Sequence, residues 1–331
     1  MFQTSKFVVE AKNAQKGYHI VVEVLFFLLT YLIASFAQSA VIAPVTFIVM
    51  LTDKEYIKAA ASLDQEKLVE ITSKIVQSDS IMLASLFSTI GIIIICLLFG
   101  KLIQKRKIST LGFQNKKIVS EYGVGIIIGF VMFSIAILIC FVTGSIQLES
   151  DFKNISIGLF LFTFVGFLIQ GMAEEVLMRG FFMVSIARRY PMFVAVFVNS
   201  VAFSMLHLLN PGITGLALIN LTLFGIFASV YFVKRGSIWG VAAIHSVWNF
   251  TQGNIYGIQV SGLNFRGSIF RVTSDSTRGI INGGSFGLEG GLAVTIVLVV
   301  GIVLVMLKMK QREVWTEEGM PIDVVQEELN F

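Results

Sequence analysis

Long apolar runs recur along this chain and constrain its fold more than any other feature. Each run has roughly 20 residues, which is the length of helix that crosses about 30 Å of hydrocarbon. The chain has 331 residues, of which 55% are hydrophobic and only 14% are charged. Such a composition excludes an ordinary soluble domain. The sequence therefore predicts an all-α, polytopic membrane protein.

The apolar runs place about eight transmembrane helices along the chain. They lie near residues 20–48, 81–100, 122–144, 156–180, 192–209, 213–233, 237–252 and 290–307. Lysine and arginine residues cluster in every second connection between these spans. Under the positive-inside rule, we expect a multi-pass protein of the cell membrane with both termini in the cytoplasm. The basic residues form no broad patch, so the lipid bilayer is an expected partner and a nucleic acid is not.

Three parts are expected along the chain. Residues 1–110 hold the first spans and a polar segment, 52–80, that is predicted to form an external amphipathic helix because it lacks Pro and Gly. Residues 111–252 form the core that carries the polar motifs. Residues 253–331 contain an external Gly-rich loop, the last span and an acidic cytoplasmic tail. The loop suits a re-entrant segment over a cavity, and an exposed linker is the simpler alternative.

Ionisable side chains inside the predicted spans point to a functional site, because each costs several kcal/mol at bilayer depth unless it is paired or faces water. They fall in three segments: AEEVLMRG with Glu174, Glu175 and Arg179, FSMLH with Phe203 and His207, and HSVWN with His245 and Asn249. A spacing of four residues recurs in each segment, so each helix turns these side chains towards one face. We therefore expect three helices to converge on one pocket.

This set of residues suits hydrolysis without a Ser or Cys nucleophile. Glu174 and Glu175 are adjacent carboxylates in an apolar setting, so one of them would accept a proton from water near neutral pH and act as a general base. One histidine can orient that water, and a second histidine with an asparagine one turn away offers donors to a developing oxyanion. Arg179, one turn from Glu175, would neutralise that carboxylate.

The motifs EExxxR, FxxxH and HxxxN, in this order on three spans, resemble those of the type II CAAX prenyl endopeptidases and their bacterial relatives, the bacteriocin-processing and immunity proteins. The resemblance covers roughly Thr110 to Asn249. It implies an intramembrane endopeptidase whose partner is a membrane-associated peptide or protein substrate.

The resemblance also implies a role for each motif residue. Glu174 and His207 would activate the attacking water, while His245 and Asn249 would form the oxyanion hole. Three further motif residues would support this catalytic group: Glu175, Arg179 and Phe203.

A metal-dependent reaction is one alternative, since Glu174, His207 and His245 could together hold a zinc ion. No HExxH motif is present, so we favour a reaction without metal or other cofactor. Two other functions stay open: a non-catalytic membrane scaffold or bacteriocin-immunity factor, and a proton-coupled transporter. The transporter is less favoured, because inverted repeats are not evident and the motifs occur once each.

Overall fold

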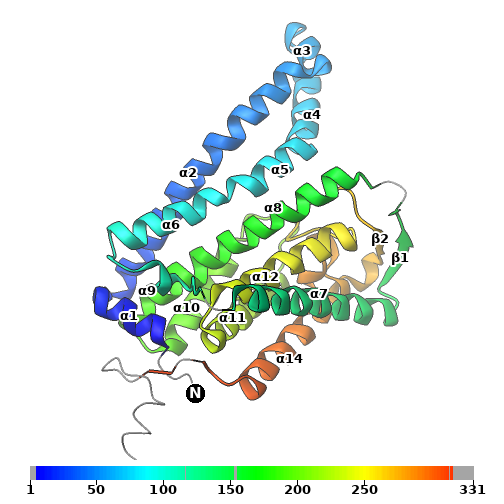
Figure 1. Cartoon of the computed structure of the whole chain (residues 1–331). Coiled ribbons are helices and arrows are strands. Elements are labelled where there is room, and N and C mark those ends of the chain that lie inside the picture. Colours follow the sequence, from blue (N-terminus) through cyan, green and yellow to red (C-terminus); the bar gives the residue numbers. More distant parts are fainter. Residues whose placement is uncertain (1–4, 116, 153–154, 313, 316–331) are drawn as a thin grey trace, which may run out of the picture.

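The computed structural model describes residues 5–115, 117–152, 155–312, 314 and 315. Among these residues, five helices are long and apolar enough to cross a membrane (Figure 1). They are α2 (Ile20–Thr52), α5 with α6 (Asp79–Ser88 and Ile90–Leu102), α7 (Ile118–Val142), α8 with its continuation (together Ile157–Ala187) and α11 (Gly215–Arg235). The prediction of an all-α polytopic membrane protein is confirmed.

The other three predicted spans correspond to shorter helices. They are α10 (Met192–Met205), α12 (Ile238–Phe250) and α14 (Leu292–Lys308). At ~1.5 Å per residue each is shorter than the hydrocarbon core is thick. Nearly every residue of α12 is buried, and the helix packs on α7, α8 and α11. Other helices of the bundle therefore surround α12.

The helix α2 and the α5–α6 segment form a hairpin that projects from the rest of the bundle (Figure 1). Two short helices, α3 (Lys54–Ala61) and α4 (Gln65–Val76), lie at its tip. They replace the single amphipathic helix predicted over 52–80. The chain breaks between them because Leu63 adopts a left-handed φ of 55° and the Asp64 side chain accepts a hydrogen bond from the Lys67 N–H, which begins a new helix.

Close approach of α7 and α8 to α12 fixes the centre of the bundle. A Cβ atom on Gly129 of α7 would lie 2.5 Å from the carbonyl oxygen of Ile244, and one on Gly171 of α8 would lie 2.7 Å from the backbone nitrogen of Ser246. Both distances are below van der Waals contact, so only glycine allows the backbones to pack this closely. Small residues at helix contacts are typical of membrane bundles. The two glycines set the depth and rotation of α12, which carries His245 and Asn249.

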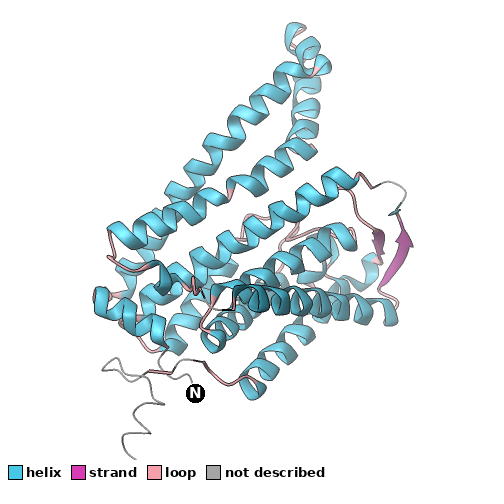
Figure 2. Cartoon of the chain, viewed as in Figure 1, coloured by secondary structure: helices cyan, strands magenta, loops and turns pink. Residues whose placement is uncertain are grey.

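A two-stranded antiparallel sheet lies at one end of the bundle, where β1 (Ile146–Ser150) pairs with β2 (Phe270–Ser274) (Figure 2). Both strands fall in segments that the sequence analysis assigned to loops. The remainder of the Gly-rich loop forms short turns: η4 (Thr251–Ile255), η5 (Ser276–Arg278), α13 (Gly279–Asn282), η6 (Gly284–Phe286) and η7 (Leu288–Gly290). Residues 260–266 of this loop line the cavity described below.

Candidate active site

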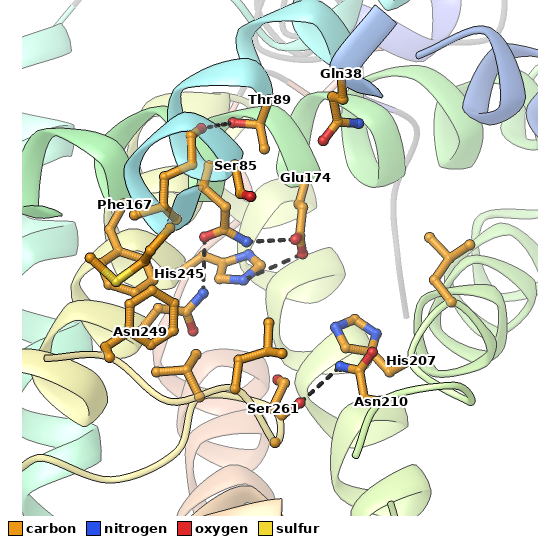
Figure 3. A pocket seen from close by; sticks show the side chains of 18 of the residues that line it. Gln38, Ser85, Thr89, Phe167, Glu174, His207, Asn210, His245, Asn249 and Ser261 are labelled. Atoms are coloured by element: carbon orange, nitrogen blue, oxygen red, sulfur yellow. Dashed lines mark hydrogen bonds and ion pairs between the residues drawn. The ribbon is translucent and has the colours of Figure 1, made fainter. Parts of the chain in front are cut away.

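A cavity of about 830 Å³ lies between the α2–α5 hairpin and the helices that carry the three motifs (Figure 3). Its walls come from α2, α4, α5, α6, α8 and its continuation, α10, the turn after α10 that carries His207, α11, α12, residues 260–266 and Glu289. Five of the predicted site residues line it: Glu174, Phe203, His207, His245 and Asn249. The three motifs therefore converge on one pocket, as their spacing predicts.

Glu174 and Glu175 are neighbours in the chain with different surroundings, because successive residues of a helix point about 100° apart. The Glu174 side chain lines the cavity and is 27% exposed. The Glu175 side chain is fully buried, and its Oε1 atom accepts a hydrogen bond from Nη1 of Arg179 at 2.7 Å. Glu174 is thus the carboxylate that can meet a ligand, and Glu175 is the one that pairs with Arg179.

The imidazole of His245 lies between these two carboxylates. Its Nδ1 atom is 2.7 Å from Oε1 of Glu175, and its Nε2 atom is 3.7 Å from Oε2 of Glu174. The aromatic ring of Phe224 packs edge-on against the imidazole, with ring centroids 5.0 Å apart. Because a carboxylate oxygen only accepts, Nδ1 carries a proton that it donates to Glu175. This hydrogen bond directs Nε2 towards Glu174 and the cavity.

Gln170 belongs to the same group, although the sequence analysis did not single it out. Its Nε2 atom donates to Oε1 of Glu174 at 2.5 Å, and its Oε1 atom accepts from Nδ2 of Asn249 at 3.0 Å. The side-chain amide therefore joins Glu174 on α8 to Asn249 on α12. The signal was available in the sequence, since Gln170 is a polar residue in an apolar span, four positions before Glu174.

His207 reaches the cavity separately from this group. In Figure 3 it lies apart from the connected side chains of Glu174, His245 and Asn249. Its Nδ1 atom is 2.8 Å from the carbonyl oxygen of Phe203, which can only accept, so Nδ1 carries the proton. The tautomer with its proton on Nδ1 has a lone pair on Nε2 that can accept a hydrogen bond. The described structure contains no direct hydrogen bond between His207 and Glu174.

Phe203 supports the site as an aromatic wall. The guanidinium carbon of Arg179 lies 4.9 Å from the centroid of its ring, and the ring of His245 meets it edge-on at 6.0 Å between centroids. Phe203 thus packs against the cation that holds Glu175 and against the imidazole held by Glu175.

The helix that carries the two glutamates widens directly after them. Residues Val176–Met183 form a π-helical segment, η3, between α8 and α9 (Val184–Ala187). π-Helical turns leave backbone carbonyls without their usual partners and are frequent at functional sites. Here the buried side chain of Arg106, in the connection before α7, donates to the carbonyls of Gly180 and Phe181 at 2.8 and 3.2 Å. The widened turn is therefore fixed by a side chain from outside the three motifs.

The zinc alternative requires Glu174, His207 and His245 to lie close enough together to bind the same ion. In the part of the chain that the structure describes, no three His, Cys, Asp or Glu side chains are grouped closely enough to hold a metal ion. The arrangement of these three residues does not fit a preformed zinc site. A metal-independent reaction stays a prediction, to be tested by chelation.

A comparison with known protein families supports the resemblance carried by the three motifs. Residues 156–251 match the family model described as type II CAAX prenyl endopeptidase Rce1-like. No curated protein and no solved structure was found to match the chain. The matched region runs from the start of α8 to the end of α12 and contains all three motifs. Residues 156–251 are therefore similar to the Rce1-like domain of type II CAAX prenyl endopeptidases, which supports the resemblance carried by the three motifs.

Proposed function

We propose that the chain is an intramembrane endopeptidase that hydrolyses a peptide bond in a membrane-associated peptide or protein. The position of Glu174 carries this proposal: its carboxylate lines the cavity, accepts a hydrogen bond from Gln170 and lies 3.7 Å from Nε2 of His245. The Rce1-like peptidase domain supports the same class of reaction. A cavity of about 830 Å³ has the size of a pocket for a short peptide segment.

In the proposed reaction, Glu174 is the general base. It takes one proton from a water molecule, and the oxygen of that water forms a bond to the carbonyl carbon of the substrate. His207 would orient the water by accepting its second proton in a hydrogen bond at Nε2. This role suits His207 because its Nδ1 proton is already engaged with the Phe203 carbonyl.

His245 and Asn249 would stabilise the negative charge that moves onto the carbonyl oxygen. An imidazolium at His245 donates from Nδ1 to Glu175 and from Nε2 to the oxyanion. The Asn249 amide has two N–H groups, of which one is bonded to Gln170, so the other is available to the same oxyanion. Such fixed donors act where charge develops, which makes them effective in a water-poor site.

Collapse of the tetrahedral intermediate completes the reaction. The carbon–nitrogen bond breaks, the oxyanion becomes a carboxyl oxygen, and the proton held by Glu174 passes to the leaving amine nitrogen. Water is thereby divided between the two products, and Glu174 returns to its carboxylate form. No covalent link to the protein forms.

The test uses full-length protein in lipid nanodiscs with a pool of membrane-associated peptides, and mass spectrometry identifies the released fragments. We expect Glu174→Ala and His207→Ala to reduce cleavage by at least about 100-fold while the protein still inserts and purifies as a single species. Glu149→Ala is the matched control, since Glu149 is exposed on β1 outside the cavity. Wild-type rates in Glu174→Ala would refute the proposed mechanism.

A further inference from the structure

A carboxylate from outside the three motifs also lines the cavity. Glu289 lies in η7, within the glycine-rich run NGGSFGLEGG, and is only 8% exposed. Carboxylates are rarely this buried without a cationic partner. In the described residues, no Lys, Arg or His nitrogen lies within 4.0 Å of Glu289.

The hydrogen bonds to Glu289 reach only one of its two oxygens. Its Oε2 atom accepts from the backbone N–H of Ser261 at 2.7 Å, from the Ser261 hydroxyl at 2.9 Å and from Nε2 of Gln252 at 3.3 Å. Its Oε1 atom has no hydrogen-bond partner in the part of the chain that the structure describes. Three donors to one oxygen hold the side chain in a single orientation and leave the other oxygen for a ligand.

The backbone around this carboxylate is equally constrained. Ser261 adopts a left-handed φ of 48°, a conformation that costs free energy for a residue other than glycine, and it directs its N–H to Glu289. Gly287 has a φ of 96°, and a Cβ there would collide with the carbonyl oxygen of Gln259. Nδ2 of Asn220 donates to the carbonyl oxygens of Glu289 and Gly291 at 2.7 and 2.9 Å. Such strain, held by surrounding bonds, is frequent at ligand-binding sites.

The charges that line the cavity leave Glu289 unbalanced. The titratable acidic and basic side chains along its walls are Asp79, Glu174, His207, His245, Arg266 and Glu289. Nε of Arg266 lies 4.0 Å from Oδ1 of Asp79, and Glu174 faces His245. Among the described residues, Glu289 is the one carboxylate of this set without a basic side chain within 4.0 Å, so a cation that entered the cavity could pair with it.

We infer that Glu289 forms a subsite for a cationic group of the substrate, either a lysine or arginine side chain or a free N-terminal ammonium. That the ligand is a peptide rests on the proposed function. The subsite lies on the His207 side of the cavity: Nδ2 of Asn210, three residues after His207, donates to the carbonyl oxygen of Ser261 at 2.9 Å, and Ser261 holds Glu289 (Figure 3). The subsite selects which segment of a peptide lies beside Glu174.

The experiment measures binding rather than cleavage, so its result does not depend on the proposed reaction. Fluorescent alanine–leucine hexapeptides carry a single Lys, Gln or norleucine at each position in turn, with a free or an acetylated N-terminus. Their affinities are measured by fluorescence anisotropy on full-length Glu174→Ala protein in nanodiscs. The same protein with Glu289→Gln tests the subsite, and Glu149→Gln is the control with the same chemical change at an exposed position.

At one position we expect the lysine peptide to bind about tenfold more tightly than its norleucine and glutamine counterparts, as for a charged hydrogen bond. Glu289→Gln should abolish this preference, and Glu149→Gln should retain it. If the N-terminus is the cation, unacetylated peptides should instead bind about tenfold more tightly than acetylated ones whatever residue stands at each position, and Glu289→Gln should abolish that difference. Equal affinities both across the substitutions and between free and acetylated N-termini, or a preference that survives Glu289→Gln, would overturn the inference and leave Glu289 only as a hydrogen-bond acceptor for Ser261. Should Glu289→Gln not fold, the lysine–norleucine comparison and its weakening by salt decide the question on the unaltered subsite.

Discussion

The Nδ1 atom of His245 lies 2.7 Å from Oε1 of Glu175, and both side chains are buried. The same oxygen of Glu175 accepts the hydrogen bond from Arg179. The second glutamate of the EExxxR motif therefore connects α8 with α12 and orients an imidazole towards the first. The two glutamates are adjacent in sequence but differ in position: Glu174 lines the cavity, and Glu175 holds the imidazole of His245 that faces Glu174.

Glu175→Gln should destabilise the protein. The substitution removes the negative charge between Arg179 and His245 and leaves a buried guanidinium without its counterion. Removal of one partner of a buried pair costs about 3–5 kcal/mol of unfolding free energy. We expect a clearly lower midpoint in thermal unfolding in detergent, with Glu149→Gln unchanged.

The double variant Glu175→Gln/Arg179→Met tests this explanation, because it removes both charges. Its midpoint should lie above that of Glu175→Gln alone. If the double variant is the less stable of the two, the unpaired guanidinium is not the cause of the loss.

Gln170→Leu should slow peptide cleavage by about 10- to 100-fold without unfolding the protein. Leucine keeps the volume of the side chain and loses the bonds to Glu174 and Asn249, so both groups lose their fixed positions. The rate is measured with the nanodisc cleavage assay, and thermal unfolding reports the fold. Gln147→Leu, on the exposed side of β1, makes the same chemical change outside the cavity and should be silent. Equal rates for the two variants would exclude a positioning role for Gln170.

Gly171→Val should disturb the packing of α8 on α12. Its side chain would collide with the backbone of Ser246, one residue after His245, whereas a Cβ on Gly158 of the same helix meets nothing within 4 Å. Overpacking of this kind costs about 1–3 kcal/mol. We therefore expect a lower unfolding midpoint and slower cleavage for Gly171→Val, and near wild-type values for Gly158→Val. Matching values for the two variants would contradict the close approach of the helices.

Chelation should leave peptide cleavage unchanged. Glu174, His207 and His245 line the same cavity, but among the described residues they are not close enough together to hold one metal ion. The measurement compares cleavage rates before and after treatment with a strong chelator, followed by addition of Zn²⁺. Loss of activity that Zn²⁺ restores would replace the proposed mechanism with a metal-dependent one.

Hydrophobic length and helical spacing made much of this protein predictable. The bilayer requires apolar helices, so the spans that became α2, α7, α8 and α11 could be read from composition alone. The same rule predicted a span at 237–252, where the structure has the short helix α12 covered by α7, α8 and α11. The strands β1 and β2 were missed because each is only five residues long and is defined by a partner more than 100 positions away in the chain.

The sequence by itself determined which residues share one pocket: the four-residue spacings within the three motifs predicted this for Glu174, His207, His245 and Asn249, and all four line the cavity. Only the tertiary structure decided how they are connected. Three features depend on the rotation and distance between packed elements. They are the hydrogen bonds of Gln170 to Glu174 and Asn249, the contact of His245 with Glu175, and the position of Glu289 in the cavity wall. Periodicity fixes the face of one helix on which a side chain lies, whereas hydrogen bonds between helices are fixed by close packing, here through Gly129 and Gly171.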